Sequence, residues 1–265
     1  MTDEAGEPTA GAQSIRRSLA ILRIVASGQE SGVRLVDVCN ATGFNRPTAH
    51  RILRVLAEEG AVEQDAGSRR YLIGREVSLL GLARIARFPI RAIAEPHLRE
   101  LSRTLGDTIF LTIRNGDDSV CLAREPGSYP VKVLSIEVGA RRPLGVGVAG
   151  LLLLGDLPAD EIKAIVQRNA SRLRALKLDP ATIAARATKA EAAGYAYVPN
   201  GVVPGTSAVA VPVRHPDGRV LAALALTAIR DRLLENAVPD RVAAMEKHAR
   251  AIGKAWAQRL KPDKR

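Results

Sequence analysis

The chain has 265 residues, of which 46% are hydrophobic and 25% charged, a composition typical of a soluble protein with room for two cores. Its formal net charge of +11 at pH 7 favours an anionic partner, either a nucleic acid or a membrane surface. The longest apolar run, residues 146–154, is far shorter than the about 20 residues that span a bilayer, and the polar, acidic N-terminus does not resemble a signal peptide. These features predict a cytoplasmic protein with no membrane partner.

The first part of the chain predicts a tail and two short helices. Residues 1–13 are polar and small, so we expect a disordered tail. Residues 15–27 predict a helix, and residues 34–41 predict a second one, which ends at the turn "ATGFN". The apolar residues of the first helix recur at helical spacing and predict one buried stripe: Ile15, Leu19, Leu22 and Ala26.

The stretch "TGFNRPTAHRILRVLAEEG", residues 42–60, predicts a third helix with two different faces. Asn45 is a suitable N-cap, Pro47 suits the first turn, and Gly60 ends the pattern. One face is apolar and is made by Ala49, Ile52, Leu53 and Leu56. The opposite face carries Arg51 and Arg54, so it is available to a partner.

The next residues, "AVEQDAGSRRYLIG", predict two short strands around a turn at residues 65–68. Three helices followed by a basic hairpin predict a winged helix-turn-helix, which would place its third helix in the major groove and its wing on adjacent phosphates. The residues we expect to contact DNA are Arg46, Thr48, His50, Arg51, Arg54, Arg69 and Arg70. The alternative is that these cations form only a solvated surface.

The remaining chain predicts a helix and a mixed domain. Residues 75–88 predict a helix with an apolar stripe made by Val77, Leu80 and Ile85. Beyond it, longer helices alternate with segments rich in Val, Ile and Leu. The expected strands cover residues 107–113, 119–125, 194–198, 206–213 and 219–229.

Catalytic and metal-binding motifs are not evident in the sequence. The four histidines and two cysteines form no H-E-x-x-H, C-x-x-C or G-x-S-x-G motif, and Cys39 and Cys121 are expected to be reduced. The run "GVGVAG", residues 145–150, lacks the ending of a phosphate-binding loop and suggests instead the start of a helix that lines a pocket. We therefore expect no enzyme activity, no metal and no cofactor.

Several segments together resemble the IclR (isocitrate-lyase regulator) family of bacterial transcription factors. They include "RLVDVCNATGFNRPTAHRILRVLAEEGAVEQD", "VGARRPLGVGVAGLLLL" and "GYAYVPNGVVPGTSAVAVPVRHPDGRVLAALALTAIRDRL". The resemblance implies an α+β protein with a winged helix-turn-helix at residues 14–74, a linker helix at 75–88 and a GAF-like α/β domain at 89–260. That domain would bind a small-molecule effector and help to form a homodimer or homotetramer. The chain differs from the family pattern at Pro47, where relatives commonly have serine.

The implied effector site also differs from the family pattern. Relatives that sense small oxo-acids have polar groups where this chain has Val198, Ala208, Ala225 and Thr227. Burying a small anion without polar partners is costly, so we expect a more apolar effector, such as an aromatic or acyl carboxylate. Backbone N–H groups with Thr227 or Ser207 would anchor it. The residues expected to bind it are Val148, Ala149, Val198, Ser207, Ala208, Ala225 and Thr227.

Two other interpretations remain open at this point. The effector positions could simply pack a core, in which case the protein binds DNA without responding to a ligand. A protein of that kind would show no thermal shift with any metabolite. The chain could also be an enzyme that carries a DNA-binding segment, which a turnover assay with a metabolite panel would detect.

Overall fold

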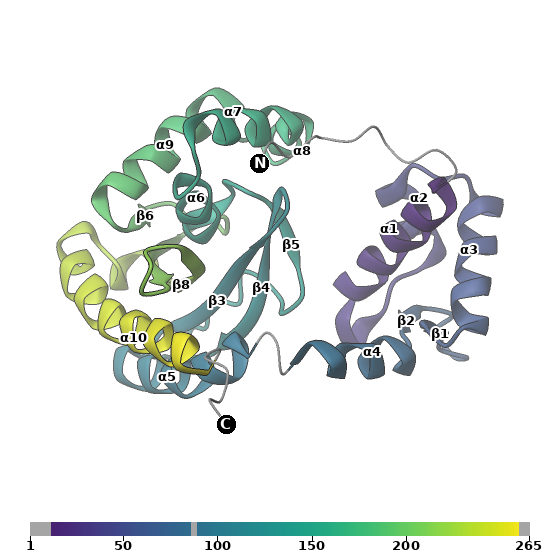
Figure 1. The fold of residues 1–265 in the computed structure, drawn as a ribbon, viewed down its shortest axis with the longest axis horizontal. Coiled ribbons are helices and arrows are strands. Elements are labelled where there is room, and N and C mark those ends of the chain that lie inside the picture. The colour runs from purple at the N-terminus through teal and green to yellow at the C-terminus, as the bar shows by residue number, and fades with distance from the viewer. Residues whose placement is uncertain (1–11, 86–88, 260–265) are drawn as a thin grey trace. The chain divides into compact units, whose positions relative to one another are not determined.

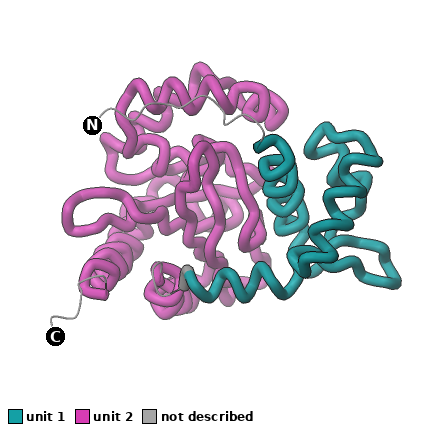
Figure 2. The backbone as a smooth tube through the Cα atoms, turned by 45° about the vertical axis from the view of Figure 1, so that its right-hand side comes forward, with its two compact units in different colours: residues 1–86 teal, residues 87–265 magenta. Residues whose placement is uncertain are grey.

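A computed structural model describes residues 12–85 and 89–259, and the chain divides into two compact units, Met1–Ala86 and Arg87–Arg265 (Figures 1 and 2). The expected tail lies outside the described residues except for its last two, and Gln13 already begins the first helix. Within the described ranges, no helix is both long and apolar enough to cross a membrane. Each unit is considered by itself below.

Unit 1 is made of three helices, a two-stranded hairpin and a following helix. Its elements are α1 (Gln13–Ser27), η1 (Gln29–Ser31), α2 (Leu35–Thr42), α3 (Arg46–Glu58), β1 (Val62–Gln64), β2 (Tyr71–Ile73) and α4 (Arg75–Ile85). The strands pair antiparallel, and Val33 forms an isolated bridge to Tyr71. This is the expected winged helix-turn-helix arrangement. The end of the expected linker helix, residues 86–88, lies outside the described residues.

The core of unit 1 confirms the apolar face of α3 but corrects that of α1. Ala49 and Leu53 are fully buried, as expected. In α1, however, Ile21 and Val25 are buried, whereas Ile15 is 63% exposed and Leu19 is 45% exposed. The helix has two neighbouring apolar rows, one with Ile21 and Val25 and the other with Ile15 and Leu19. The contacts of α1 with α2, α3 and β2 decide that the first row is buried. Helical periodicity alone could not distinguish them.

The start of α3 follows the expected capping chemistry. The Asn45 side chain accepts a hydrogen bond of 3.0 Å from the backbone N–H of Thr48. Pro47 occupies the first turn, where a backbone N–H has no partner within the helix, so its missing donor costs α3 nothing. At the other end, Gly60 adopts a φ of +68°, which favours glycine.

Unit 2 contains a six-stranded antiparallel sheet in the order β5-β4-β3-β8-β7-β6. Its strands are β3 (Thr108–Asn115), β4 (Asp118–Glu125), β5 (Arg141–Pro143), β6 (Ala196–Val198), β7 (Thr206–Arg214) and β8 (Val220–Ile229). All five expected strands are present. The sixth, β5, was missed because its three residues, Arg-Arg-Pro, have no strand-like pattern.

Helices cover both faces of this sheet (Figure 1). The longer helices α5 (Ile90–Leu105) and α10 (Val238–Arg259) lie on one face. On the other face lie α6 (Gly147–Gly155) and α9 (Pro180–Ala193), accompanied by α7 (Ala159–Arg168) and α8 (Ala170–Ala175). Two short 3₁₀ turns, η2 (Arg230–Arg232) and η3 (Glu235–Ala237), lead from β8 to α10.

The two faces of the sheet carry side chains of different size. Successive residues of a strand point to opposite faces. Toward α5 and α10 the central strands present large residues, which are Val209, Val211, Val213, Leu224 and Leu226. Toward α6 and α9 they present small ones, which are Ala208, Ala210, Ala223 and Ala225. The alanine face therefore leaves space beneath α6.

Gly253 makes the close contact between α10 and the sheet possible, and this generates a stability prediction. A Cβ atom at Gly253 would overlap the carbonyl oxygen of Arg214 in β7. Gly253→Ala should therefore destabilise the protein by about 1–3 kcal/mol in urea-induced unfolding.

The matched control is Gly81→Ala, another helical glycine, where nothing lies within 4 Å of the added Cβ. That change should stabilise its helix by about 0.5–1 kcal/mol. Wild-type stability of Gly253→Ala would contradict this account of the packing.

Candidate functional site

The first candidate surface is the outer side of α3. Arg46, His50, Arg51 and Arg54 are exposed there, because Ala49 and Leu53 face the core. Thr48 is half-buried, and its backbone N–H is used by the Asn45 cap. Arg54 lies 3.5 Å from Glu58 one turn later, an exposed ion pair that contributes little stability. The structure thus gathers on one helix face four of the cations expected to contact DNA, Arg46, His50, Arg51 and Arg54.

The turn between the two strands of the wing is stabilised by hydrogen bonds from Ser68 to the Asp65 carboxylate. Asp65 accepts hydrogen bonds from the backbone N–H of Ser68 at 2.7 Å and from its hydroxyl at 2.6 Å, and these bonds lower the pKa of the Asp65 carboxyl. Arg69 follows with a φ of +58° and an exposed side chain. A groove between the wing, α2 and the start of α3 is lined by residues that include Arg46, His50 and Arg69. The turn therefore places a wing cation beside those of α3.

Arg70 has a different environment from Arg69. Its side chain is half-buried, and its guanidinium donates a hydrogen bond of 3.1 Å to the carbonyl oxygen of Gly32. This bond joins the wing to the segment before α2. Arg70 thus differs from Arg69 in its environment, because one of its donors is used within the protein.

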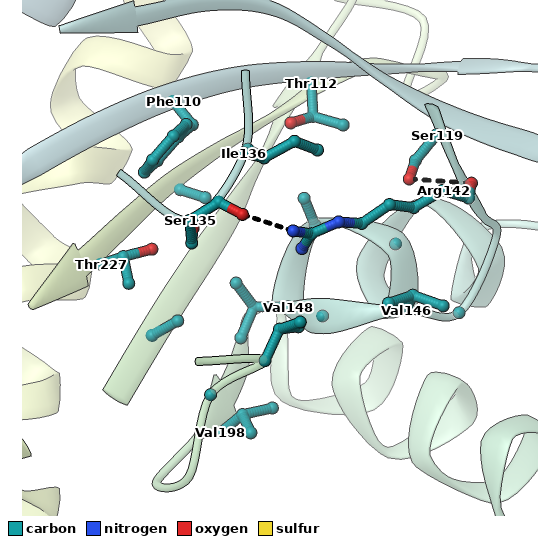
Figure 3. Close-up of a pocket in the computed structure, with 18 of the residues that line it drawn as sticks. Phe110, Thr112, Ser119, Ser135, Ile136, Arg142, Val146, Val148, Val198 and Thr227 are labelled. Atoms are coloured by element: carbon teal, nitrogen blue, oxygen red, sulfur yellow. Dashed lines mark hydrogen bonds between the residues drawn. The ribbon is translucent and has the colours of Figure 1, made fainter. Parts of the chain in front are cut away.

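The second candidate site is a cavity of about 140 Å³ in unit 2. It lies under the alanine face of the sheet, beside the start of α6, and Figure 3 shows its lining side chains. The lining includes six of the residues expected to bind an effector, which are Val148, Ala149, Val198, Ala208, Ala225 and Thr227. Thr227 pairs with Ala208 across β7 and β8, and Phe110 pairs with Ala225 across β3 and β8. The sheet register thus brings these distant residues together.

Ser207 does not line the cavity. It is fully buried, and its hydroxyl donates a hydrogen bond of 3.0 Å to the carbonyl oxygen of Pro199. Because side chains alternate along β7, Ser207 points away from the face that carries Thr206 and Ala208. The expectation that Ser207 anchors an effector is therefore wrong.

The structure adds polar lining residues that the sequence did not reveal. Arg142 on β5, Thr112 on β3 and Ser119 on β4 all line the cavity, and Arg186 on α9 lies at its rim with an exposed side chain. The Ser119 hydroxyl donates to the Arg142 carbonyl oxygen at 3.4 Å. The basic pair in "GARRPLG" was the only signal for Arg142, and no periodic pattern showed which way either arginine points.

The glycine-rich run forms the wall of the cavity at the start of α6. Gly145 and Gly147 have φ values of +97° and +67°, and a Cβ at Gly145 would overlap Ile183 of α9. Val146 occupies the N-cap and offers no hydrogen-bonding side chain, so the first N–H groups of α6 lack a capping partner. This backbone therefore presents donors where the side chains are apolar.

Within the described residues there is no metal site, because no three His, Cys, Asp or Glu side chains lie close enough together to hold a metal ion. His97 and His248 contact each other, with their Nδ1 atoms 3.0 Å apart between α5 and α10. Cys121 of β4 is buried, and burial raises the pKa of its thiol to about 11. A thiol in this environment is protonated at neutral pH and hence poorly nucleophilic.

Two family models match the chain. Residues 14–66 match the IclR helix-turn-helix domain, and residues 82–254 match "Bacterial transcriptional regulator IclR C-terminal", so the two matches together cover most of the sequence. The chain belongs to the IclR family. As in other IclR-family transcriptional regulators, a helix-turn-helix domain precedes a C-terminal α/β domain, and the expected α+β fold is confirmed.

Named relatives of this IclR-family chain include transcriptional regulators. The regulator XynR of Escherichia coli K12 is 28% identical over 83% of this chain and 88% of its own length. The repressor AllR of Klebsiella pneumoniae is 30% identical over 89% of this chain and 86% of its own.

Solved structures of IclR-family proteins share the fold. A regulator from Alicyclobacillus acidocaldarius has a TM-score of 0.72 and 25% identity, with coverage of 92% of this chain and 98% of that one. A homologue from Microbacterium hydrocarbonoxydans, complexed with 4-hydroxybenzoate, has a TM-score of 0.66 and 21% identity, with coverage of 91% and 98%.

Proposed function

We propose that this IclR-family regulator binds double-stranded operator DNA through α3 and the wing, and that an effector in the unit 2 cavity changes its operator affinity. The observation that carries the proposal is the cavity itself, which combines an apolar lining with a few polar groups. In this scheme residues 14–74 bind DNA, 75–88 form the linker helix and 89–260 form the effector-binding and oligomerisation domain. Such a regulator acts on the chromosome and hence in the cytoplasm.

The DNA-binding part of the proposal rests on two groups of cations with different roles. Arg51 and Arg54 lie on the exposed face of α3, where a major-groove helix presents side chains to base edges. Arg46, Thr48 and His50 lie near the start of α3, where contacts to bases or adjacent phosphates are made. Arg69 extends from the wing and suits a phosphate contact. Arg70 would support the wing.

The effector part of the proposal rests on the size and chemistry of the cavity. An apolar cavity of roughly 150 Å³ is large enough for benzene, so one of about 140 Å³ fits a single aromatic ring. Thr112 and Thr227 are buried beside it, and their hydroxyls have no protein partner among the described residues. We infer a relatively apolar effector with a polar end, such as an aromatic carboxylate. The fold relative that holds 4-hydroxybenzoate is consistent with this class.

The alternative functions differ in what the cavity does. A ligand-independent DNA-binding protein would have no use for unpartnered hydroxyls in a buried site. An enzyme would turn over a ligand bound in the cavity, whereas the relatives are named as transcriptional regulators. We infer that the chain is a regulator rather than an enzyme.

We also propose that the protein is at least a homodimer. In α4, Leu79, Leu80 and Leu82 are 56%, 66% and 61% exposed. Adjacent exposed leucines on one helix are typical of an interface, and a second copy of α4 would cover them. A two-fold dimer would bind pseudo-palindromic half-sites separated by one helical turn of about 10 bp or a multiple of it.

The DNA proposal predicts different losses from α3 and the wing. Arg51→Ala should weaken operator binding by about 1–3 kcal/mol if the arginine contacts a base edge. Arg69→Ala should instead weaken binding to operator and scrambled duplexes alike and reduce the salt dependence. Fluorescence anisotropy over a salt series measures both. Arg186→Ala in unit 2 is the control and should bind like wild type, whereas unchanged affinity of both α3 and wing variants would contradict the assignment.

The dimer proposal predicts that a charge on the α4 leucines separates the subunits. Leu80→Asp should raise the dimer dissociation constant by at least about tenfold, because the carboxylate would be buried without a partner. Sedimentation velocity over a concentration series measures the change. Gly81→Asp adds the same charge on the opposite side of the helix from the three leucines, at an exposed position with nothing within 4 Å, and should leave the dimer intact. Equal assembly of both variants would show that these leucines are not in the interface.

The effector proposal predicts a thermal shift that one substitution removes. A ligand at 100 times its dissociation constant stabilises the folded state by about 2.7 kcal/mol, so benzoate or 4-hydroxybenzoate should raise the melting temperature more than pyruvate or glyoxylate. Ala208→Asp should abolish this shift by placing a carboxylate in the cavity, while non-specific DNA binding stays intact.

The control for Ala208→Asp is Ser207→Ala, whose side chain faces away from the cavity. This variant should lose its hydrogen bond to Pro199 but keep the ligand-induced shift. Stabilisation by pyruvate-sized acids but not by aromatic acids would contradict the apolar effector class.

A further inference from the structure

Arg142 brings a positive charge into a cavity whose surface is otherwise mostly apolar. Its side chain starts from β5 and is half-buried, and its guanidinium reaches toward the centre of the lining residues (Figure 3). One terminal nitrogen donates to the carbonyl oxygen of Ser135. A guanidinium has five N–H donors, so this bond orients the group while leaving other donors for a ligand.

Arg142 has no acidic partner among the described residues, unlike comparable arginines of the same unit. Arg141 lies 3.1 Å from Asp118, Arg124 lies 2.7 Å from Glu137, and Arg232 lies 2.9 Å from Asp107. Burial lowers the pKa of Arg142, and the absence of a nearby carboxylate leaves that cost uncompensated. A cation held in this way gains most from an anion that enters the cavity.

We propose that Arg142 anchors the anionic group of the effector and makes the cavity selective for carboxylates over neutral molecules of the same shape. This inference rests on the proposed function, in which the cavity binds an effector. The start of α6 supports it, because uncapped N–H groups at the same cavity also favour negative charge. Arg186 contributes only from the exposed rim.

The position of Arg142 also orients the ligand. The apolar end would lie against Phe110, Ala208 and Ala225, which share the sheet face beneath α6. The Thr227 hydroxyl lies on that face beside Ala208 and is available to a second polar substituent. The cavity thus recognises a ligand with a carboxylate at one end and a ring or short chain at the other.

The test compares benzoate with benzamide, which has nearly the same shape but no charge. Isothermal titration calorimetry on the full-length protein should show that wild type binds benzoate more tightly than benzamide. Arg142→Met keeps a long unbranched side chain but removes the guanidinium and its charge, so benzoate affinity should fall by about tenfold to a hundredfold. Benzamide affinity should change by less than about threefold, because only the charge-assisted bonds are lost. Arg174→Met is the matched control, because Arg174 is an exposed arginine of α8 that does not line the cavity, and it should keep the wild-type preference.

Two further measurements separate ligand recognition from structural support. Without ligand, Arg142→Met should be at least as thermally stable as wild type, because the variant removes a half-buried charge without a carboxylate partner. Arg142→Lys keeps the charge but loses the planar fork, so its preference for benzoate should be intermediate. This second variant tests the inference even if the methionine variant fails to fold.

The outcomes distinguish the inference from the proposed function. If wild type prefers benzoate and the Arg142 variants keep that preference, the anchor is wrong while the effector class stands. If wild type binds benzamide as tightly as benzoate, the anchor is also wrong. If wild type binds neither probe, the proposed aromatic effector class fails, and the anchor fails with it.

Discussion

The alternation of side chains along β7 and β8 is the constraint on which unit 2 depends. Each residue that faces α10 forces its neighbours to face α6, so one sheet has to satisfy two different packing partners. Large residues such as Val211 and Leu224 fill the side under α5 and α10. Alanines at 208 and 225 leave the other side underfilled. The cavity is therefore a consequence of residue size on one face of a continuous sheet.

That packing explains why polar side chains without protein partners in the described parts of the chain are found around the cavity. In a filled core, a half-buried arginine without a carboxylate would be a defect, and so would a buried threonine hydroxyl without a partner. Around a cavity the same groups are accessible as hydrogen-bonding groups, as in ligand sites generally. The neighbouring residue, Arg141, forms an ion pair with Asp118, whereas Arg142 has no carboxylate partner among the described residues. A residue that lowers the stability of the folded protein is commonly retained because it serves the protein's function.

Unit 1 differs from unit 2, because its candidate functional residues lie on the exposed surface, whereas its core contains only packed apolar side chains. Ala49 and Leu53 fix the rotation of α3, so Arg51 and Arg54 necessarily face outward. Asp65 and Ser68 shape the wing turn, and Arg70 ties it to Gly32. Arg69, by contrast, is exposed at that end. Two adjacent arginines thus have different environments.

The sequence by itself determined the features that depend on local patterns. The capped α3, the basic hairpin, five strands of the sheet and the small apolar residues around Ala208 and Ala225 could all be predicted, because periodicity and turn chemistry act over a few residues. Only the tertiary structure decided which apolar row of α1 is buried, that Ser207 points away from the cavity, and that Arg142 points into it. Those outcomes depend on strand register and on contacts between segments far apart in the chain, about which a local pattern carries no information.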